Sequence, residues 1–198
     1  MSVSTRHKSR QRYDAFSMTL HWITAFSVIF LFTSAHIWEQ LEKGTPMRKG
    51  LQAWHISFGI LLALVMIVRP LWRLYSQRQS HLAVAPADNS ALMRIMAHAV
   101  HGLLYLLLFT QVVLGFLFRW SQQEPFSFFG LFDVPTFIHV DTALRHTLAG
   151  LHNNVAWALI VLAGAHAVAA LLHHYVLRDN VLRRMLPLRD SMPLREDK

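Results

Sequence analysis

The chain of 198 residues contains no cysteine. It therefore cannot form disulfides, thiolate metal sites, iron–sulfur clusters or the covalent haem attachment of a C-x-x-C-H motif. Charge is also scarce, because Asp, Glu, Lys and Arg make up 15% of the residues while apolar residues make up 54%. Four long stretches carry no charged residue at all: 15–38, 50–68, 95–118 and 146–177.

Each uncharged stretch is close to the length of a membrane-spanning helix, which needs about 20 mostly apolar residues. Core helices of soluble proteins rarely run so far without a charge. The first stretch is too long for the apolar part of a secretory signal and lacks a convincing cleavage site, so it predicts an uncleaved helix. We expect an all-α fold, a transmembrane four-helix bundle with helices at 15–38, 50–75, 94–119 and 145–177. It forms one integral membrane domain over 1–198.

The positive charges are distributed unevenly among the loops. Most of them lie in the N-terminus, in the second connector with its flanks and in the C-terminus. This group consists of Arg6, Lys8, Arg10, Arg12, Arg69, Arg73, Arg78, Arg94, Arg178, Arg183, Arg184, Arg189, Arg195 and Lys198. The other two loops hold only Lys43, Arg48, Lys49, Arg119 and Arg145. Because cytoplasmic loops carry the excess of Lys and Arg, both termini are expected to be cytoplasmic in a bacterial inner membrane. The net charge of +8 is then a topology signal, and no nucleic acid partner is expected.

Histidine is abundant, with 13 residues in the chain. Eight of them lie well inside the predicted spans, and His36 and His146 lie at the interfaces. The eight are His21, His55, His98, His101, His152, His166, His173 and His174. A buried imidazole needs a partner, and a single one often finds a hydroxyl or a carbonyl group across a helix interface. So many imidazoles in four helices exceed that structural use, and they indicate a functional site.

Spacing along the fourth span predicts two sites at two depths. His152 and His166 are 14 residues apart, which returns a helix to nearly the same face about 21 Å further along its axis. His55 begins the second span at the outer level, and His21 begins the first span at the inner level. Two pairs follow, His55–His152 and His21–His166. At the inner level, depth alone leaves His101 and His173 open as alternatives.

The residue types favour haem over other metal groups. Zinc usually takes four ligands, and these spans offer no thiolate or carboxylate to complete its tetrahedron. A di-iron carboxylate centre needs acidic residues within the spans. Haem brings four equatorial nitrogens and needs one axial ligand on each side, which a pair of histidines supplies. Bis-histidine ligation disfavours oxygen binding and favours electron transfer, so two stacked b haems would form a path across the membrane.

Several motifs together resemble those of the bacterial cytochrome b561 family, which is related to the cytochrome b subunits of nickel–iron hydrogenases. The matching pieces are Leu20-His21-Trp22, Trp54-His55 through Arg69 and Arg73, His98-x-x-His101, His152 and His166, His173-His174-Tyr175, Asp179-Asn180, and Arg184-Met185-Leu186-Pro187. The resemblance covers most of the chain and implies two b haems, with axial ligands at His21, His55, His152 and His166. One departure is Leu151-His152-Asn153-Asn154, where similar chains tend to have Trp-His-Glu, so the polar neighbour of His152 is changed.

The resemblance also implies a reaction. Some similar proteins are superoxide oxidases, which take an electron from superoxide and reduce ubiquinone. Lys43, Arg48, Lys49 and Arg145 could attract a small anion to the outer haem or could be ordinary loop cations. Arg69 and Arg73 either pair with propionates of the inner haem or only reflect the excess of positive charge on the cytoplasmic side.

The alternative function is a haem-bearing anchor subunit that serves a separate dehydrogenase or hydrogenase. Expected partners are membrane lipid, quinone and either superoxide or an electron-donor protein. His98 and His101 could instead line a proton or quinone path.

Overall fold

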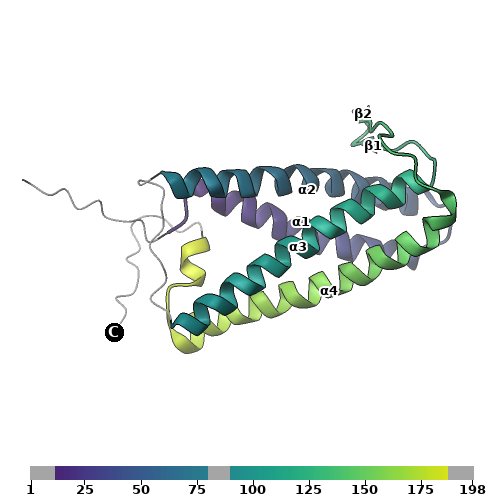
Figure 1. Ribbon diagram of the computed structural model, residues 1–198. Helices are drawn as coiled ribbons and strands as arrows, with labels where there is room; N and C mark the ends of the chain where they lie inside the picture. The colour runs from purple at the N-terminus through teal and green to yellow at the C-terminus, as the bar shows by residue number, and fades with distance from the viewer. Residues whose placement is uncertain (1–11, 80–89, 187–198) are drawn as a thin grey trace, which may run out of the picture.

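The computed structural model describes residues 12–79 and 90–186, and it consists of four long helices lying lengthwise beside one another (Figure 1). They are α1 (Ala15–Glu39), α2 (Pro46–Arg78), α3 (Ala91–Ser121) and α4 (Arg145–Leu172). All four are long and apolar enough to cross a membrane, which confirms the predicted all-α transmembrane four-helix bundle. Residues 80–89 of the second connector lie outside the described residues, as do six of the cations predicted to be cytoplasmic: Arg6, Lys8, Arg10, Arg189, Arg195 and Lys198.

The helix ends follow from capping residues. Asp14 caps α1 and accepts a hydrogen bond from the Ser17 N–H at 2.9 Å. Thr45 caps α2 directly before Pro46, a residue suited to the first helical position because its missing N–H has no helical partner there. Ser90 caps α3. As a result α2 and α3 begin before the positions 50 and 94 that charge alone predicted.

Small polar residues bring the helices of the bundle close together. On α1 the buried positions are Leu20, Thr24, Ser27 and Ser34, which recur at three- and four-residue steps along one face. Such small side chains let helix backbones approach closely within a membrane. In this bundle α1 packs mainly on α2, and α3 packs mainly on α4.

An apolar core joins three of the four helices at the middle of the bundle. Leu62 and Met66 of α2 meet Leu108 of α3 and Leu159 of α4. Outside this core, large apolar side chains point outward on every helix; Phe109, for example, is 62% exposed and Val161 is 66% exposed. This inside-out distribution is stable only where lipid replaces water around the bundle.

One end of the bundle, here called the hairpin end, contains residues 40–45 and 122–144. A short antiparallel hairpin lies there, formed by β1 (Ser127–Phe128) and β2 (Phe132–Asp133), and η1 (Thr142–Leu144) leads into α4. Phe129 and Gly130 make the turn with positive φ angles of 49° and 71°. The hairpin is tied to α2 because Phe129 N–H donates to Ser57 Oγ at 2.8 Å. Sequence patterning did not predict these two strands.

The opposite end, here called the tail end, carries the start of α1 and the end of α4. There α4 passes into a π-helical turn, η2 (His173–Leu177), which closes at Arg178 with a positive φ of 55°. The chain then folds back through η3 (Leu182–Met185) to the start of α1. Trp22 Nε1 donates to the Met185 carbonyl at 2.8 Å, so the last described segment is anchored to the bundle.

Candidate functional site

At the hairpin end, the structure brings His55 of α2 and His152 of α4 together. Their ring centroids lie 6.4 Å apart, with the ring planes inclined at 66°. Trp38 packs edge-on against His55 at 4.8 Å and limits the rotation of its ring. The two rings therefore face each other from different helices within the bundle.

The hydrogen bonds of His55 leave its Nε2 free. Ser34 Oγ donates its single proton to the Leu31 carbonyl at 3.1 Å, so it can only accept from His55 Nδ1, 3.2 Å away. The proton of the neutral ring is then on Nδ1, and Nε2 keeps its lone pair. This is the tautomer that binds a metal through Nε2.

His152 has the same tautomer for a different reason. Gln111 Nε2 is a donor and lies 3.1 Å from His152 Nε2, which must therefore be the acceptor. A Cβ atom built on Gly115 would lie 3.3 Å from His152 Cε1, so only glycine leaves the ring its full space. Four polar atoms in this region are shielded from solvent and have no partner among the described residues: Gln111 Oε1, His152 Nδ1, Arg119 Nε and Trp120 Nε1.

At the tail end, three imidazoles meet around α4. The ring centroids of His21 and His166 lie 6.4 Å apart, the same separation as in the other pair. His101 of α3 also faces His166, at 5.1 Å. The structure thus brings the predicted pair together and keeps one of its two alternatives at the same place.

Arg69 sets the tautomer of His21. One guanidinium nitrogen lies 3.0 Å from His21 Nδ1, and because arginine only donates, the ring proton must be on Nε2. The guanidinium also lies over the Tyr105 ring at 5.2 Å. By contrast, His101 Nδ1 donates to the Ala97 carbonyl at 2.7 Å, which leaves its Nε2 free. For His21 to bind iron through Nε2, Arg69 must turn to another acceptor.

The other predicted alternative, His173, does not join either pair. Its Nδ1 lies 2.5 Å from Asp179 Oδ2 across the π-helical turn. His98 Nδ1 donates to the carbonyl of Arg94, and its side chain is exposed. No ring contact with the paired histidines is found for His98, His173 or His174 within the described part of the chain.

The spacing of both pairs fits haem. With metal–imidazole bonds of about 2.0 Å on each side, the centroids of two axial rings lie roughly 6 Å apart. Within residues 12–79 and 90–186, no three His, Asp or Glu side chains form a group able to hold a bare metal ion. Two nitrogens facing each other are too few for zinc but sufficient for haem. The free Nε2 atom of His55 agrees with that use, whereas Gln111 must release His152 Nε2 before that atom can bind iron.

Outside the spans, Asp14 is the group whose titration is perturbed. Burial by itself raises the pKa of this carboxyl group, but hydrogen bonds from the Ser17 hydroxyl, the Ser17 N–H and Trp72 Nε1 outweigh burial. The pKa therefore lies below its ordinary value. This carboxylate joins the start of α1 to Trp72 of α2 at the tail end of the bundle.

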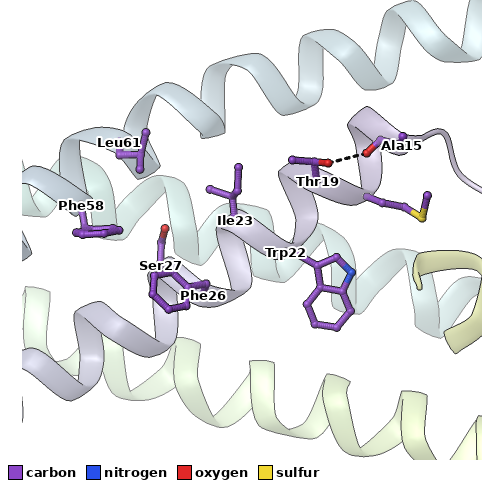
Figure 2. A pocket seen from close by; sticks show the side chains of 9 residues that line it. Ala15, Thr19, Trp22, Ile23, Phe26, Ser27, Phe58 and Leu61 are labelled. Atoms are coloured by element: carbon purple, nitrogen blue, oxygen red, sulfur yellow. Dashed lines mark hydrogen bonds between the residues drawn. The ribbon is translucent and has the colours of Figure 1, made fainter. Parts of the chain in front are cut away.

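An apolar groove of about 590 Å³ lies between α1 and α2, away from the histidines (Figure 2). Figure 2 shows the Ser27 hydroxyl directed toward Phe58 and Leu61 of α2. The groove has no titratable residue among those that line it. Its lining consists of Ala15, Met18, Thr19, Trp22, Ile23, Phe26, Ser27, Phe58 and Leu61.

Sequence reasoning missed several residues of the sites. Ser34 and Gln111 bond the paired rings, Gly115 gives one ring its space, and Arg119 is partly buried beneath the hairpin. Only Arg119 carried a signal in the sequence, since it stands at the end of an uncharged span, and it was counted as a loop cation. The others depend on which helix faces are in contact.

Fold and site together define a membrane-spanning bundle that presents histidine pairs at two depths, the class of the membrane-bound b-type cytochromes. Residues 12–188 match the family model described as prokaryotic cytochrome b561. Cytochrome b561 homolog 2 of Escherichia coli is 34% identical over 177 residues, covering 89% of this chain and 92% of that relative. The probable superoxide oxidase CybB of Yersinia pestis is 29% identical, covering 89% and 97%. Cytochrome b562 of Cereibacter sphaeroides is 26% identical, covering 88% and 94%.

The chain belongs to the prokaryotic cytochrome b561 family. Membership makes it a multi-pass electron-transfer protein of the inner membrane and implies b-type haem.

Proposed function

We propose that this chain carries two b haems and moves electrons from a donor on the periplasmic side, superoxide among them, to ubiquinone in the membrane. His55 and His152 would hold one haem at the hairpin end, and His21 and His166 the second at the tail end. The observation that carries this proposal is the equal 6.4 Å separation of two histidine pairs at opposite ends of one bundle. When bound, haem supplies reversible one-electron chemistry, and a bis-histidine site leaves no axial position for oxygen.

The orientation follows from charge. The cations concentrated near the tail end favour a cytoplasmic location for that end and for both termini. The hairpin end would then face the periplasm. Arg48, one of the cations predicted to attract an anion there, instead donates to the Trp38 and Leu41 carbonyls at 2.7 Å and caps α1. Lys43 and Lys49 are exposed and remain available to draw a small anion toward this end.

Arg69 supports a haem at the tail end. Its guanidinium group is partly buried at membrane depth, and no carboxylate of the described residues forms an ion pair with it. A haem propionate would give it a planar acceptor that matches its paired N–H donors. Once Arg69 turns to that acceptor, His21 can carry its proton on Nδ1 and offer Nε2. Arg73 lies over the Tyr13 ring at 5.2 Å and is the second cation at this level.

The overall reaction balances electrons and protons. Two superoxide ions each give up one electron and leave as dioxygen, and ubiquinone takes up two electrons and two protons to become ubiquinol. One relative is named a probable superoxide oxidase, which supports this donor. The part played by the chain is to hold the two redox centres at fixed positions and to exclude water between them.

The decisive experiment is a reduced-minus-oxidised visible spectrum of purified protein in detergent, with haem quantified per chain. His21, His55, His152 and His166 are each replaced by Ala, and His101→Ala serves as the matched control at the tail end. Two low-spin haems are expected in the parent and one in each ligand variant, with His101→Ala retaining both. Loss of a haem in His101→Ala but not in His21→Ala would reassign the tail-end ligand. Well-folded protein without haem would disprove the proposal.

The same preparation tests the alternative function of an anchor subunit. A self-contained oxidoreductase reduces ubiquinone with superoxide as an isolated chain. An anchor subunit shows no such turnover and co-purifies from native membranes with a separate dehydrogenase or hydrogenase.

A further inference from the structure

Arg119 is a half-buried cation at the hairpin end. It stands in the last turn of α3, where one terminal nitrogen donates to Gln122 Oε1 and the guanidinium lies over the Phe126 ring at 5.4 Å. Its Nε atom is shielded from solvent and has no acceptor among the described residues. A charged donor left without an acceptor in such a place costs free energy, so it needs an anion.

The hairpin causes this burial. Phe126 is only 6% exposed, and its carbonyl accepts from the Val134 N–H at 2.9 Å, which closes the loop over the end of α3. The nearest acidic residue along the chain, Glu124, is exposed and close enough to act on Arg119 through space, but no ion pair joins the two side chains in the described structure. Arg119 Nε thus has no acceptor among the described residues, and a bound group could supply one.

The register of α3 connects Arg119 to the hairpin-end histidines. Gln111, Gly115 and Arg119 follow one another at four-residue steps, which places them along one stripe of the helix. The first two both contact the ring of His152. Arg119 is about one turn, roughly 6 Å, further toward the hairpin end than Gly115. A group bound between His55 and His152 therefore has Arg119 above it, on the side that leads to water.

We infer that Arg119 binds a carboxylate at this place, and that the carboxylate is a propionate of the hairpin-end haem. This inference rests on the proposed function. The planar fork formed by Nε and a terminal nitrogen matches the two oxygens of a carboxylate. The charged propionates of a haem held by His55 and His152 would favour the side of the site that leads to water, where Arg119 stands in the last turn of α3. Because Arg119 Nε is shielded from solvent, a carboxylate that reaches it from inside the bundle is favoured over a free anion.

Arg119 is then a positioning residue with an electrostatic effect. A positive charge next to a haem stabilises the reduced state, in which the iron carries one positive charge less. Arg119 would raise the midpoint potential of the hairpin-end haem and leave the tail-end haem unaffected, because the two levels lie about 21 Å apart along α4. A higher potential makes this haem a better acceptor for an electron from outside.

Redox titration of the holoprotein, followed through the visible spectrum, tests this inference without any turnover. The variants are Arg119→Gln, Arg119→Lys and the control Lys43→Gln, which removes one positive charge from an exposed position at the same end. We expect a lower midpoint potential for one haem in Arg119→Gln, a smaller decrease in Arg119→Lys and no change in Lys43→Gln. Redox-difference infrared spectra with haem labelled at the propionate carbons should show a shifted carboxylate band in Arg119→Gln only.

Three results would overturn the inference. Both potentials and the carboxylate band could stay unchanged in an Arg119→Gln protein that retains both haems. The potential could fall equally in Lys43→Gln, which would indicate a general surface-charge effect. Reduction of the haem by superoxide could slow in Arg119→Gln while the potentials and the band remain, which would assign Arg119 to an incoming anion. If Arg119→Gln does not fold, Arg119→Lys carries the test, with the tail-end haem as the internal measure of folding. Absence of haem from the parent would instead refute the proposed function.

Discussion

Replacing Gly115 by Ala should disturb one redox site and spare the other. The added Cβ atom would lie 3.3 Å from His152 Cε1 and 3.7 Å from His152 Nδ1. Favourable carbon–carbon contacts begin at about 3.5 Å, so the ring must move by roughly 0.2–0.5 Å. Because ligand geometry tolerates displacements of only about 0.5 Å, that movement should strain axial ligation at the hairpin end.

The size of the effect follows from two opposing terms. Overpacking in a close-packed interior costs about 1–3 kcal/mol, whereas Gly→Ala in a helix gains about 0.5–1 kcal/mol. A net loss of about 1–2 kcal/mol corresponds to a roughly 5- to 30-fold weaker retention of the hairpin-end haem. Gly102 is the matched control, because it lies on the same helix and a Cβ atom there would meet nothing within 4 Å. Gly102→Ala should therefore gain only the helix-propensity contribution of about 0.5–1 kcal/mol to stability.

The assay is transfer of haem from the detergent-solubilised protein to excess apomyoglobin, followed by the visible spectrum. In Gly115→Ala, one of two haems should leave faster than in the parent, and Gly102→Ala should match the parent. Equal loss rates for both haems in Gly115→Ala would mean that the ring of His152 is not an axial ligand in the position described. That result would refute the reasoning even if total haem content fell.

Three further predictions address the supports of the fold and of the sites. Ser34→Ala removes the acceptor of the His55 Nδ1–H, so retention of the hairpin-end haem should fall about 10-fold, measured by the same transfer assay. Ser57→Ala leaves the Phe129 N–H without its acceptor at a cost of about 1–3 kcal/mol. Hydrogen exchange in residues 126–133 should rise while exchange in α4 stays constant. Because the pKa of Asp14 is lowered in the folded state, its stabilising contribution is present above the ordinary carboxyl pKa of about 4 and is lost as the pH falls through the folded value. In Asp14→Asn, the melting temperature should therefore fall less steeply than in the parent as the pH is lowered. An unchanged slope would contradict this account.

The transmembrane architecture could be predicted because it depends on local properties. A span of about 20 residues without charge has few stable alternatives to a membrane helix, whatever its neighbours are. Helix ends were harder to place, since Thr45-Pro46 extends α2 into a stretch whose Arg48 and Lys49 argued for a loop. A capping pair overrides charge there, and the side chain of Arg48 satisfies the carbonyl groups at the end of α1.

The pairing of histidines could be anticipated in part. A separation of 14 residues specifies face and depth on a single helix, and His152 and His166 indeed face partners at opposite ends. Their role as haem ligands stays a prediction. Depth could not separate His21 from His101, because that choice depends on helix rotation, and both rings face His166 in the structure. The proton positions set by Ser34 and Arg69 come from contacts between helices, which no spacing within one helix reveals.

The layer between the two histidine levels explains why this arrangement suits electrons and not ions. Along α2 no charged residue stands between His55 and Arg69, and along α4 none stands between His152 and His166. The buried side chains of this layer are uncharged: Leu62 belongs to an apolar cluster, and Thr24 and Ser27 of α1 are small and polar. An ion entering such a medium would lose its hydration and find no partner, at a cost of many kcal/mol. An electron can pass between two fixed redox centres, one on each side of this layer, without any carrier crossing the layer. The lack of charged residues between the histidine levels on α2 and α4 is therefore suited to electron transfer.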